Sequence, residues 1–182
     1  MPRLTLVRHG RAAAGWGDDL DPGLDDLGRA QAESVAKALE EQGPLPIIVS
    51  PLRRTRETAA PLEARWQSTA TVDPAVGEIP SPSEDLAERA GWLGPVMRSS
   101  WDDQPPELHA WRQRVLDALL AINEDTVVVT HFVAINVAYG AATKDSRVTC
   151  FAPDNCSRTV FDSDGKTFTL VETGGQAETR VL

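Results

Sequence analysis

Two of the three histidines in this chain directly follow short apolar runs. His9 comes after LTLVR at residues 4–8, and His131 comes after VVVT at residues 127–130. A neutral imidazole can act as a nucleophile or carry a proton, and Arg8 adds a positive charge next to His9. A lone histidine at a strand end is commonly a structural residue. Two of them, one beside an arginine, make a catalytic role as well supported as a structural one.

A third polar group follows the apolar run PIIV at residues 46–49. The pair Ser50-Pro51 is typical of a helix start, with serine as the N-cap and proline in the first turn. Arg54 would then lie in that first turn, where backbone N–H groups already favour anions. Ligands of open α/β sheets bind at the carboxyl ends of the strands. We therefore expect His9, His131 and the start of this helix to form one anion-binding site.

The hydrophobic pattern predicts alternating strands and helices around these residues. Strands are expected at residues 3–7, 46–50 and 126–130, and helices at residues 26–42, 51–66 and 107–123, with an apolar segment at 132–142. Residues 156–174 alternate and contain Asp164-Gly165, which indicates a hairpin. The fold class we predict is three-layer α/β/α, with a mostly parallel central sheet, helices on both faces and a C-terminal β-hairpin. We expect a single domain over residues 1–182.

Residues 74–106 are the least regular part of the chain and contain six prolines. A long irregular stretch inside a compact domain is commonly a functional loop or a lid. We therefore predict that this stretch, together with the loop at residues 11–23, borders the substrate.

Composition narrows the classes of partner. The net charge of −9 argues against nucleic acid, although positive residues gathered in a cleft can still bind a small anion. No apolar run is long enough to span a bilayer, which predicts no membrane partner. Cys150 and Cys156 are expected to be reduced thiols, which favours a cytoplasmic protein. The spacing of the histidines gives no support for a metal site. The oligomeric state is left open.

Four motifs together resemble the histidine phosphatase superfamily, the phosphoglycerate-mutase-like group. They are LVRHG at residues 6–10, LDDLGRAQA at residues 24–32, SPLRRTRETA at residues 50–59 and VVVTH at residues 127–131. The resemblance covers roughly residues 4 to 140. The chain is short and lacks the motif that follows the acid in the extended mutases, so it resembles the compact phosphatase branch.

The resemblance implies that His9 is a nucleophile that forms a phosphohistidine, which water then hydrolyses. Arg8, Arg54 and His131 would surround the phosphoryl oxygens. Positioning and charge stabilisation of this kind supply most of the catalysis in phosphoryl transfer. The family needs no cofactor for this chemistry.

The resemblance also implies a carboxylic acid that protonates the leaving oxygen. Glu78 in VGEIPSP matches by position, just before the proline-rich stretch. Burial beside an anionic site would raise its pKa toward neutrality, as a general acid requires. Glu84, Asp85 and Glu88 are nearby rivals.

Four further residues are candidates for substrate binding. Gly10 would let the backbone turn sharply beside the phosphate. Phe132 stands where the family commonly has glycine, and it would either narrow the pocket or pack against the sheet. Arg11 and Asn136 are candidates for the pocket rim, with a structural role as the alternative.

We therefore expect a phosphomonoester hydrolase that acts through His9 on a small phosphorylated metabolite. The alternatives are a protein phosphohistidine phosphatase, a phosphoglycerate-type mutase and a non-catalytic phosphate-binding module. A lid formed by residues 74–106 would favour a small molecule, whereas an open, shallow pocket would favour a protein substrate.

Overall fold

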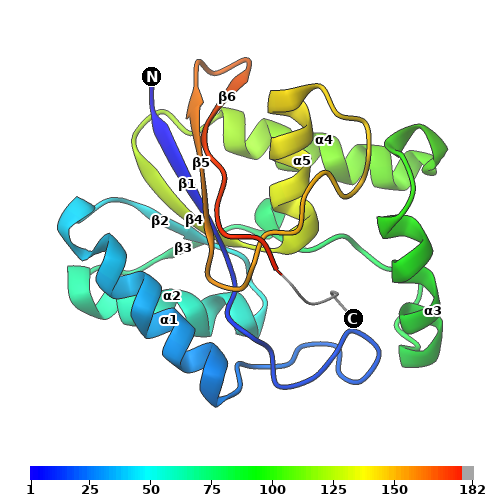
Figure 1. Cartoon of the computed structure of the whole chain (residues 1–182), viewed down its shortest axis with the longest axis horizontal. Helices are drawn as coiled ribbons and strands as arrows, with labels where there is room; N and C mark the ends of the chain where they lie inside the picture. Colours follow the sequence, from blue (N-terminus) through cyan, green and yellow to red (C-terminus); the bar gives the residue numbers. More distant parts are fainter. Residues whose placement is uncertain (178–182) are drawn as a thin grey trace.

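The computed structural model describes residues 1–177, which contain one six-stranded sheet with helices on both faces (Figure 1). The strands are β1 (Arg3–Arg8), β2 (Ile47–Val49), β3 (Thr71–Val72), β4 (Thr126–Thr130), β5 (Arg158–Ser163) and β6 (Phe168–Glu172). Their order is β3-β2-β4-β1-β5-β6. The first four in this order are parallel, and β5 and β6 are antiparallel. This confirms the predicted α/β fold with a C-terminal hairpin.

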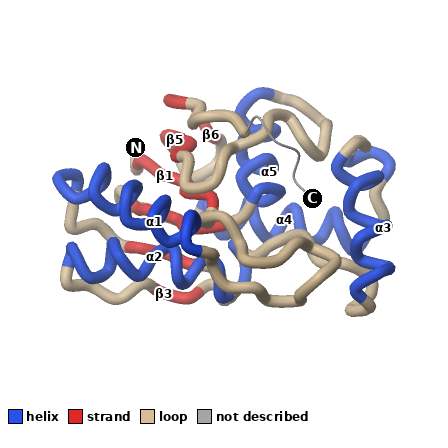
Figure 2. Tube along the Cα trace, turned by 60° about the horizontal axis from the view of Figure 1, so that its bottom comes forward, coloured by secondary structure: helices blue, strands red, loops and turns tan. Residues whose placement is uncertain are grey.

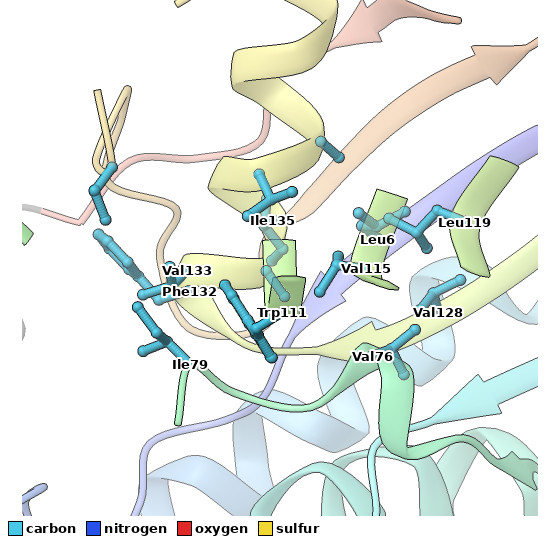
Figure 3. Packing of buried hydrophobic residues seen from close by; sticks show 14 of the residues in the cluster. Leu6, Val76, Ile79, Trp111, Val115, Leu119, Val128, Phe132, Val133 and Ile135 are labelled. Carbon is cyan, nitrogen blue, oxygen red and sulfur yellow. The ribbon is translucent and has the colours of Figure 1, made fainter. Parts of the chain in front are cut away.

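One face of the sheet packs against α4 (Pro106–Leu120) and α5 (Phe132–Thr143). Leu4 and Leu6 of β1 and Val128 of β4 belong to this larger core, together with Val115 and Leu119 of α4, and most of them are labelled in Figure 3. Each of these side chains is at most 2% exposed. Burying one such side chain contributes about 1.5–3 kcal/mol to the free energy of unfolding, so this core holds the strands at fixed positions.

The other face packs against α1 (Asp26–Leu39) and α2 (Arg53–Trp66), which lie side by side in Figures 1 and 2. Val7, Val127 and Val129 belong to this second core, in contact with helix residues that include Leu39 and Leu62. Successive side chains of a strand point to opposite faces of a sheet. The alternation of Val127, Val128 and Val129 between the two cores therefore confirms that both faces are covered.

The parallel register brings the polar residues after β1, β2 and β4 to one edge of the sheet. Arg8 is paired with Thr130, and Val49 is paired with Val129. The backbone N–H of His9 donates to the carbonyl of Thr130 at 3.0 Å, and the N–H of Ser50 donates to that of Val129 at 3.2 Å. The three strand ends thus meet as predicted.

The predicted start of α2 was wrong by two residues. The helix begins at Arg53 and its N-cap is Leu52, which has extended backbone (φ −70°, ψ 146°), so Ser50 and Pro51 precede the helix. The Ser50 hydroxyl is instead 2.8 Å from Nε2 of His131. Arg54 still lies in the first turn.

The prediction of an irregular stretch at residues 74–106 was wrong in its middle. Residues 86–97 form α3 (Leu86–Met97), and short 3-10 turns occur at Pro74–Val76 and Trp101–Asp103. Asp85 caps α3, because its carboxylate accepts from the backbone N–H of Glu88 at 3.0 Å. In Figures 1 and 2 α3 stands apart from the other helices.

Other helix ends differ slightly from the prediction. A 3-10 turn at Glu40–Gln42 continues α1, and α4 ends at Leu120 rather than at residue 123. Within residues 1–177, no helix is both long and apolar enough to cross a bilayer.

Glycine is needed at position 10 for close packing against Gly28, and not for the sharp turn that was predicted. A Cβ at Gly10 would lie 2.6 Å from the carbonyl oxygen of Gly28, and a Cβ at Gly28 would lie 2.1 Å from that of Arg11. The two glycines allow the chain after β1 to pass directly against the start of α1. They therefore set the position of the residues next to His9.

We predict that Gly28→Ala lowers the free energy of unfolding by about 1–3 kcal/mol, because backbone atoms must move to make room. Gly91→Ala is the matched control, since a Cβ there meets nothing within 4 Å. Gly91 lies inside α3, so alanine should stabilise the protein by about 0.5–1 kcal/mol. Urea unfolding of both variants measures the difference. Equal stabilisation by the two substitutions would contradict the close packing at Gly28.

Candidate active site

His9 lies immediately after β1 and is 7% exposed. Its Nδ1 is 2.7 Å from the carbonyl oxygen of Gly10, which can only accept, so Nδ1 carries the proton. Its Nε2 accepts from Nε of Arg54 at 3.2 Å. Both contacts require the same tautomer, with an unprotonated Nε2. This nitrogen has the lone pair that a nucleophile needs.

His131 lies directly after β4 and is fully buried, and its ring centroid is 5.3 Å from that of His9. The backbone N–H of Leu52 donates to the Ser50 hydroxyl at 3.4 Å, and Nε2 of His131 is within reach of the Ser50 proton at 2.8 Å. The Ser50 hydroxyl therefore orients the ring of His131 through Nε2. When Ser50 donates this hydrogen bond, the proton of His131 is on Nδ1, which can then donate to a ligand.

The buried guanidinium groups of Arg8 and Arg54 give the site its positive charge. They are 8% and 6% exposed. Nη1 of Arg8 donates to the carbonyl of Pro153 at 2.8 Å, and its Cζ lies 5.2 Å from the ring centroid of Phe132. Burial lowers the pKa of both arginines, but guanidinium groups remain charged in proteins.

Burial and these two arginines together keep both histidines neutral. Burial lowers the pKa of His9 well below its usual value, and the positive charges of Arg54 and Arg8 lower it further. The pKa of His131 is also lowered, first by burial and then by Arg54. A nucleophilic imidazole must be neutral, so this electrostatic environment favours attack by His9.

Two nitrogen atoms of the site have no partner within the part of the chain that the structure describes. They are Nε of Arg8 and Nδ1 of His131, and both are buried. A buried polar atom without a partner costs about 1–3 kcal/mol. Arg8 lines the same cavity as His9, so a bound anion could satisfy its Nε.

Glu78 follows the turn after β3, and its side chain is 10% exposed. Burial raises the pKa of Glu78, while the charges of Arg54 and Arg8 oppose the increase. Its Oε1 accepts from the N–H of Ile79 at 2.9 Å, and its Oε2 lies 4.0 Å from Nδ1 of His131. Because His131 is neutral, this contact is not an ion pair.

The three rivals of Glu78 are all exposed on or near the start of α3. Asp85 is the N-cap of that helix, and Glu84 and Glu88 flank it. Glu78, in contrast, lines the same cavity as His9. The structure therefore brings Glu78 to the site and leaves the rivals outside it.

A cavity of about 360 Å³ opens beside His9. It is bounded by the strand ends, the loop at residues 11–22, α3 and the segment at 153–155. Its lining comprises Arg8, His9, Arg11, Ala12, Ala13, Ala14, Gly15, Trp16, Asp19, Leu20, Pro22, Arg54, Glu78, Arg89, Leu93, Met97, Phe132, Val133, Asp154, Asn155 and Ala177.

The four predicted substrate-binding residues have different positions. Arg11 lines the cavity and forms an ion pair with Asp25. Phe132 lines the cavity and also packs into the larger core, so both roles considered for it occur together. The backbone N–H of Gly10 donates to the Thr58 hydroxyl at 2.9 Å. Gly10 therefore joins β1 to α2.

The prediction that Asn136 lies on the pocket rim was wrong. Asn136 is fully buried inside α5. Its Oδ1 accepts from the N–H groups of Cys150 and Phe151 at 2.7 and 3.1 Å, and its Nδ2 donates to the carbonyl of Phe132 at 3.0 Å. Asn136 holds the loop after α5 in place.

Sequence reasoning missed two residues that position His9 and His131. Nδ2 of Asn155 donates to the backbone carbonyl of His9 at 3.0 Å, although 146 positions separate them. Ser50 was recognised as a polar residue at a strand end, but its predicted role was that of a helix cap and not of a partner for His131. The signal for Ser50 was its place at a strand end, which is also where His9 and His131 occur. No comparable local signal marks Asn155.

Within residues 1–177, no three histidine, cysteine or acidic side chains lie close enough together to hold a metal ion. The side chains around the cavity are an imidazole with an unprotonated Nε2, two buried guanidinium groups and the carboxyl group of Glu78.

A family model described as the histidine phosphatase superfamily (branch 1) matches residues 4–175. The chain belongs to the histidine phosphatase superfamily. The resemblance of the RHG and SPLxR motifs to this family is thereby confirmed, and the match extends through the C-terminal hairpin.

Relatives and solved structures agree with this membership. The chain is 32% identical over 115 residues to the glucosyl-3-phosphoglycerate phosphatase of Mycobacterium tuberculosis. The matched region covers 61% of this chain and 48% of that protein. The chain thus spans about half the length of this curated relative. Bacillus stearothermophilus YhfR has a TM-score of 0.77 at 21% identity, covering 94% of this chain and 96% of that chain.

A phosphoserine phosphatase of Entamoeba histolytica, solved with 3-phosphoglyceric acid, has a TM-score of 0.75 at 21% identity and covers 98% of both chains. At this level of identity, the two structural likenesses show the histidine phosphatase fold and nothing finer.

We predict that His9 and His131 remain neutral at pH 6.0, where about three-quarters of free imidazoles are protonated. The reason is the lowering of both pKa values by burial and by the arginine charges. Nitrogen-15 chemical shifts of the imidazoles measure their protonation in the phosphate-free protein, and His9→Ala and His131→Gln variants assign the signals. Imidazolium shifts for His9 at this pH would contradict the site electrostatics.

Proposed function

We propose that this chain is a cofactor-independent phosphomonoester hydrolase that acts through a phosphohistidine on His9. The observation that carries the proposal is the unprotonated Nε2 of His9, held by Arg54 beside the buried guanidinium of Arg8, whose Nε has no partner in the described chain. A phosphoryl group supplies both the electrophile for the nitrogen of His9 and an acceptor for Nε of Arg8. Membership of the histidine phosphatase superfamily supports the same reaction.

In the first step, Nε2 of His9 attacks phosphorus and the bond from phosphorus to the ester oxygen breaks. The leaving oxygen takes the proton of Glu78, whose raised pKa keeps that proton available at a higher pH than usual. In the second step, water attacks the phosphohistidine and passes a proton back to Glu78. The phosphorus–nitrogen bond breaks, and inorganic phosphate and neutral His9 are restored.

Three cationic or neutral donors stabilise the charge that develops on the phosphoryl oxygens. Arg8 and Arg54 supply positive charge in a site with little water, where it is worth more than at the surface. Nδ1–H of His131 supplies a further hydrogen bond. Because these groups are positioned before the substrate binds, little reorganisation opposes the reaction.

The cavity supports a small phosphorylated metabolite as the substrate. Arg89, Leu93 and Met97 of α3 form one of its walls, so part of residues 74–106 borders the cavity. This enclosure favours a small molecule over a phosphohistidine on a protein surface. The named relatives, a glucosyl-3-phosphoglycerate phosphatase and a phosphoserine phosphatase, agree with that substrate class.

The two cysteines support a cytoplasmic location. Cys150 and Cys156 are free thiols, and burial raises their pKa values to about 11 and about 12. The thiol forms are therefore maintained at neutral pH.

We predict that a phosphomonoester labels the wild-type protein with acid-labile phosphate and that His9→Ala abolishes this label. His109→Ala is the matched control, because His109 is exposed on α4 and should leave the labelling unchanged. Rapid quench with radiolabelled substrate measures the phosphoenzyme, and released phosphate measures turnover. Turnover by folded His9→Ala at the wild-type rate would overturn the proposal. Phosphate binding without turnover of any ester would indicate the non-catalytic alternative.

We predict that Glu78→Gln lowers kcat/KM about 10²- to 10³-fold for an alkyl phosphate but much less for p-nitrophenyl phosphate. The value of kcat/KM reports the first step alone, in which an alkoxide leaving group needs the proton of Glu78 and nitrophenolate leaves without it. For the alkyl ester, wild-type kcat/KM should fall as the pH rises through the raised pKa of Glu78, and the variant should lose this limb. Glu88→Gln, at an exposed site on α3, is the control. Equal losses with both esters would contradict a role as general acid.

A further inference from the structure

Arg89 is a preorganised cation in the wall of the cavity. It lies in the first turn of α3, and its guanidinium carbon is 4.0 Å from the centroid of the Trp16 ring. Nε of Arg89 donates to the backbone carbonyl of Trp16 at 3.4 Å, and the indole N–H of Trp16 donates to the carbonyl of Arg89 at 3.0 Å. These three contacts hold the guanidinium of Arg89 on the indole of Trp16 and join the loop at residues 11–22 to α3.

Arg89 forms no ion pair with any residue in the part of the chain that the structure describes. Among residues 1–177, no carboxylate oxygen lies within 4.0 Å of its guanidinium nitrogens, in contrast to Arg11, Arg53 and Arg65, which all form ion pairs. Burial lowers the pKa of Arg89, and the charge of the exposed Glu84, which acts from farther away, opposes only part of this decrease.

The backbone of α3 does not stabilise a positive charge at the position of Arg89. The first turn of a helix favours acidic side chains, because unpaired backbone N–H groups make it positive. The cavity gives a reason for the arginine, since Arg89 lines it together with Arg54. The two charges are close enough that Arg89 lowers the pKa of Arg54.

We propose that Arg89 forms a second anion-binding subsite, which holds a carboxylate of the substrate while Arg8 and Arg54 hold its phosphate. This inference rests on the proposed function and specifies the substrate class as phosphomonoesters that carry a carboxylate. Nε of Arg89 is occupied by Trp16, so Nη1 and Nη2 remain as a planar fork. Such a fork matches the two oxygens of a carboxylate. Trp16 positions the fork and does not contact the reacting atoms.

Acidic side chains elsewhere in the cavity make this recognition local. Asp19 and Asp154 also line the cavity and repel an anionic group. Within the cavity, a carboxylate of the substrate is therefore favoured only next to an arginine that forms no ion pair with the protein. The substrate is expected to place its phosphate at His9 and its carboxylate at Arg89.

The test compares 3-phosphoglycerate with glycerol 3-phosphate, which has a hydroxymethyl group in place of the carboxylate. The wild type should show a higher kcat/KM for the carboxylate ester. Arg89→Gln should reduce the ratio of the two kcat/KM values about 10- to 100-fold, mainly because the carboxylate ester binds more weakly and its KM rises. Arg89→Lys keeps the charge but loses the fork, so it should restore only part of the ratio. Arg98→Gln, at an exposed arginine next to the same helix, should leave the ratio unchanged.

An unchanged ratio in folded Arg89→Gln would overturn the subsite, as would a wild type with no preference for the carboxylate. Calorimetric binding of both probes to the His9→Ala variant separates this inference from the proposed function. If neither ester is hydrolysed by the wild type, the proposed function fails. A preference for binding 3-phosphoglycerate that Arg89→Gln removes would still support the subsite, and its absence would overturn it.

Discussion

The burial of two positively charged guanidinium groups beside two histidines is the interaction on which the rest of the site depends. Arg8 and Arg54 are almost inaccessible to water and are held by a backbone carbonyl and by Nε2 of His9, respectively, rather than by carboxylates. Burial lowers the pKa of both imidazoles, and the charges of the two arginines lower it further, so both rings stay neutral. A buried charge without a counterion is costly, so the site favours a ligand that brings negative charge. For the same reason, the site is expected to bind a negatively charged phosphoryl group more tightly than an uncharged group.

The fold makes this arrangement possible through a few long-range contacts. Parallel strands place the residues after β1, β2 and β4 at one edge of the sheet, and the covered faces hold those strands rigid. The glycine contact between Gly10 and Gly28 then sets the path of the chain after β1. Asn155 and Pro153 reach back from the far end of the sequence to hold the carbonyl of His9 and the guanidinium of Arg8. A catalytic geometry of this kind requires that nearly the whole chain be folded.

Much of this could be predicted from the sequence. Apolar runs such as VVVT indicate a buried strand in a chain of this size, and the polar residues at their ends indicated the site. The failures have physical causes. Ser50-Pro51 has the chemistry of a helix cap, but the hydroxyl of Ser50 lies against His131, which is 81 positions away. Prolines in residues 74–106 concealed α3, because five of the six lie outside this helix and only Pro95 lies inside it. Asn136 could be placed only once its partners at residues 150 and 151 were known.

The central claim is that Nε2 of His9 is the atom that receives the phosphoryl group. Phosphorus-31 NMR of the trapped, denatured phosphoenzyme tests it most directly, because the two isomers of phosphohistidine have different chemical shifts. The account predicts the Nε2 isomer on His9, since Nδ1 is protonated and bound to the carbonyl of Gly10. Phosphate on Nδ1, on His131 or on another side chain would contradict it.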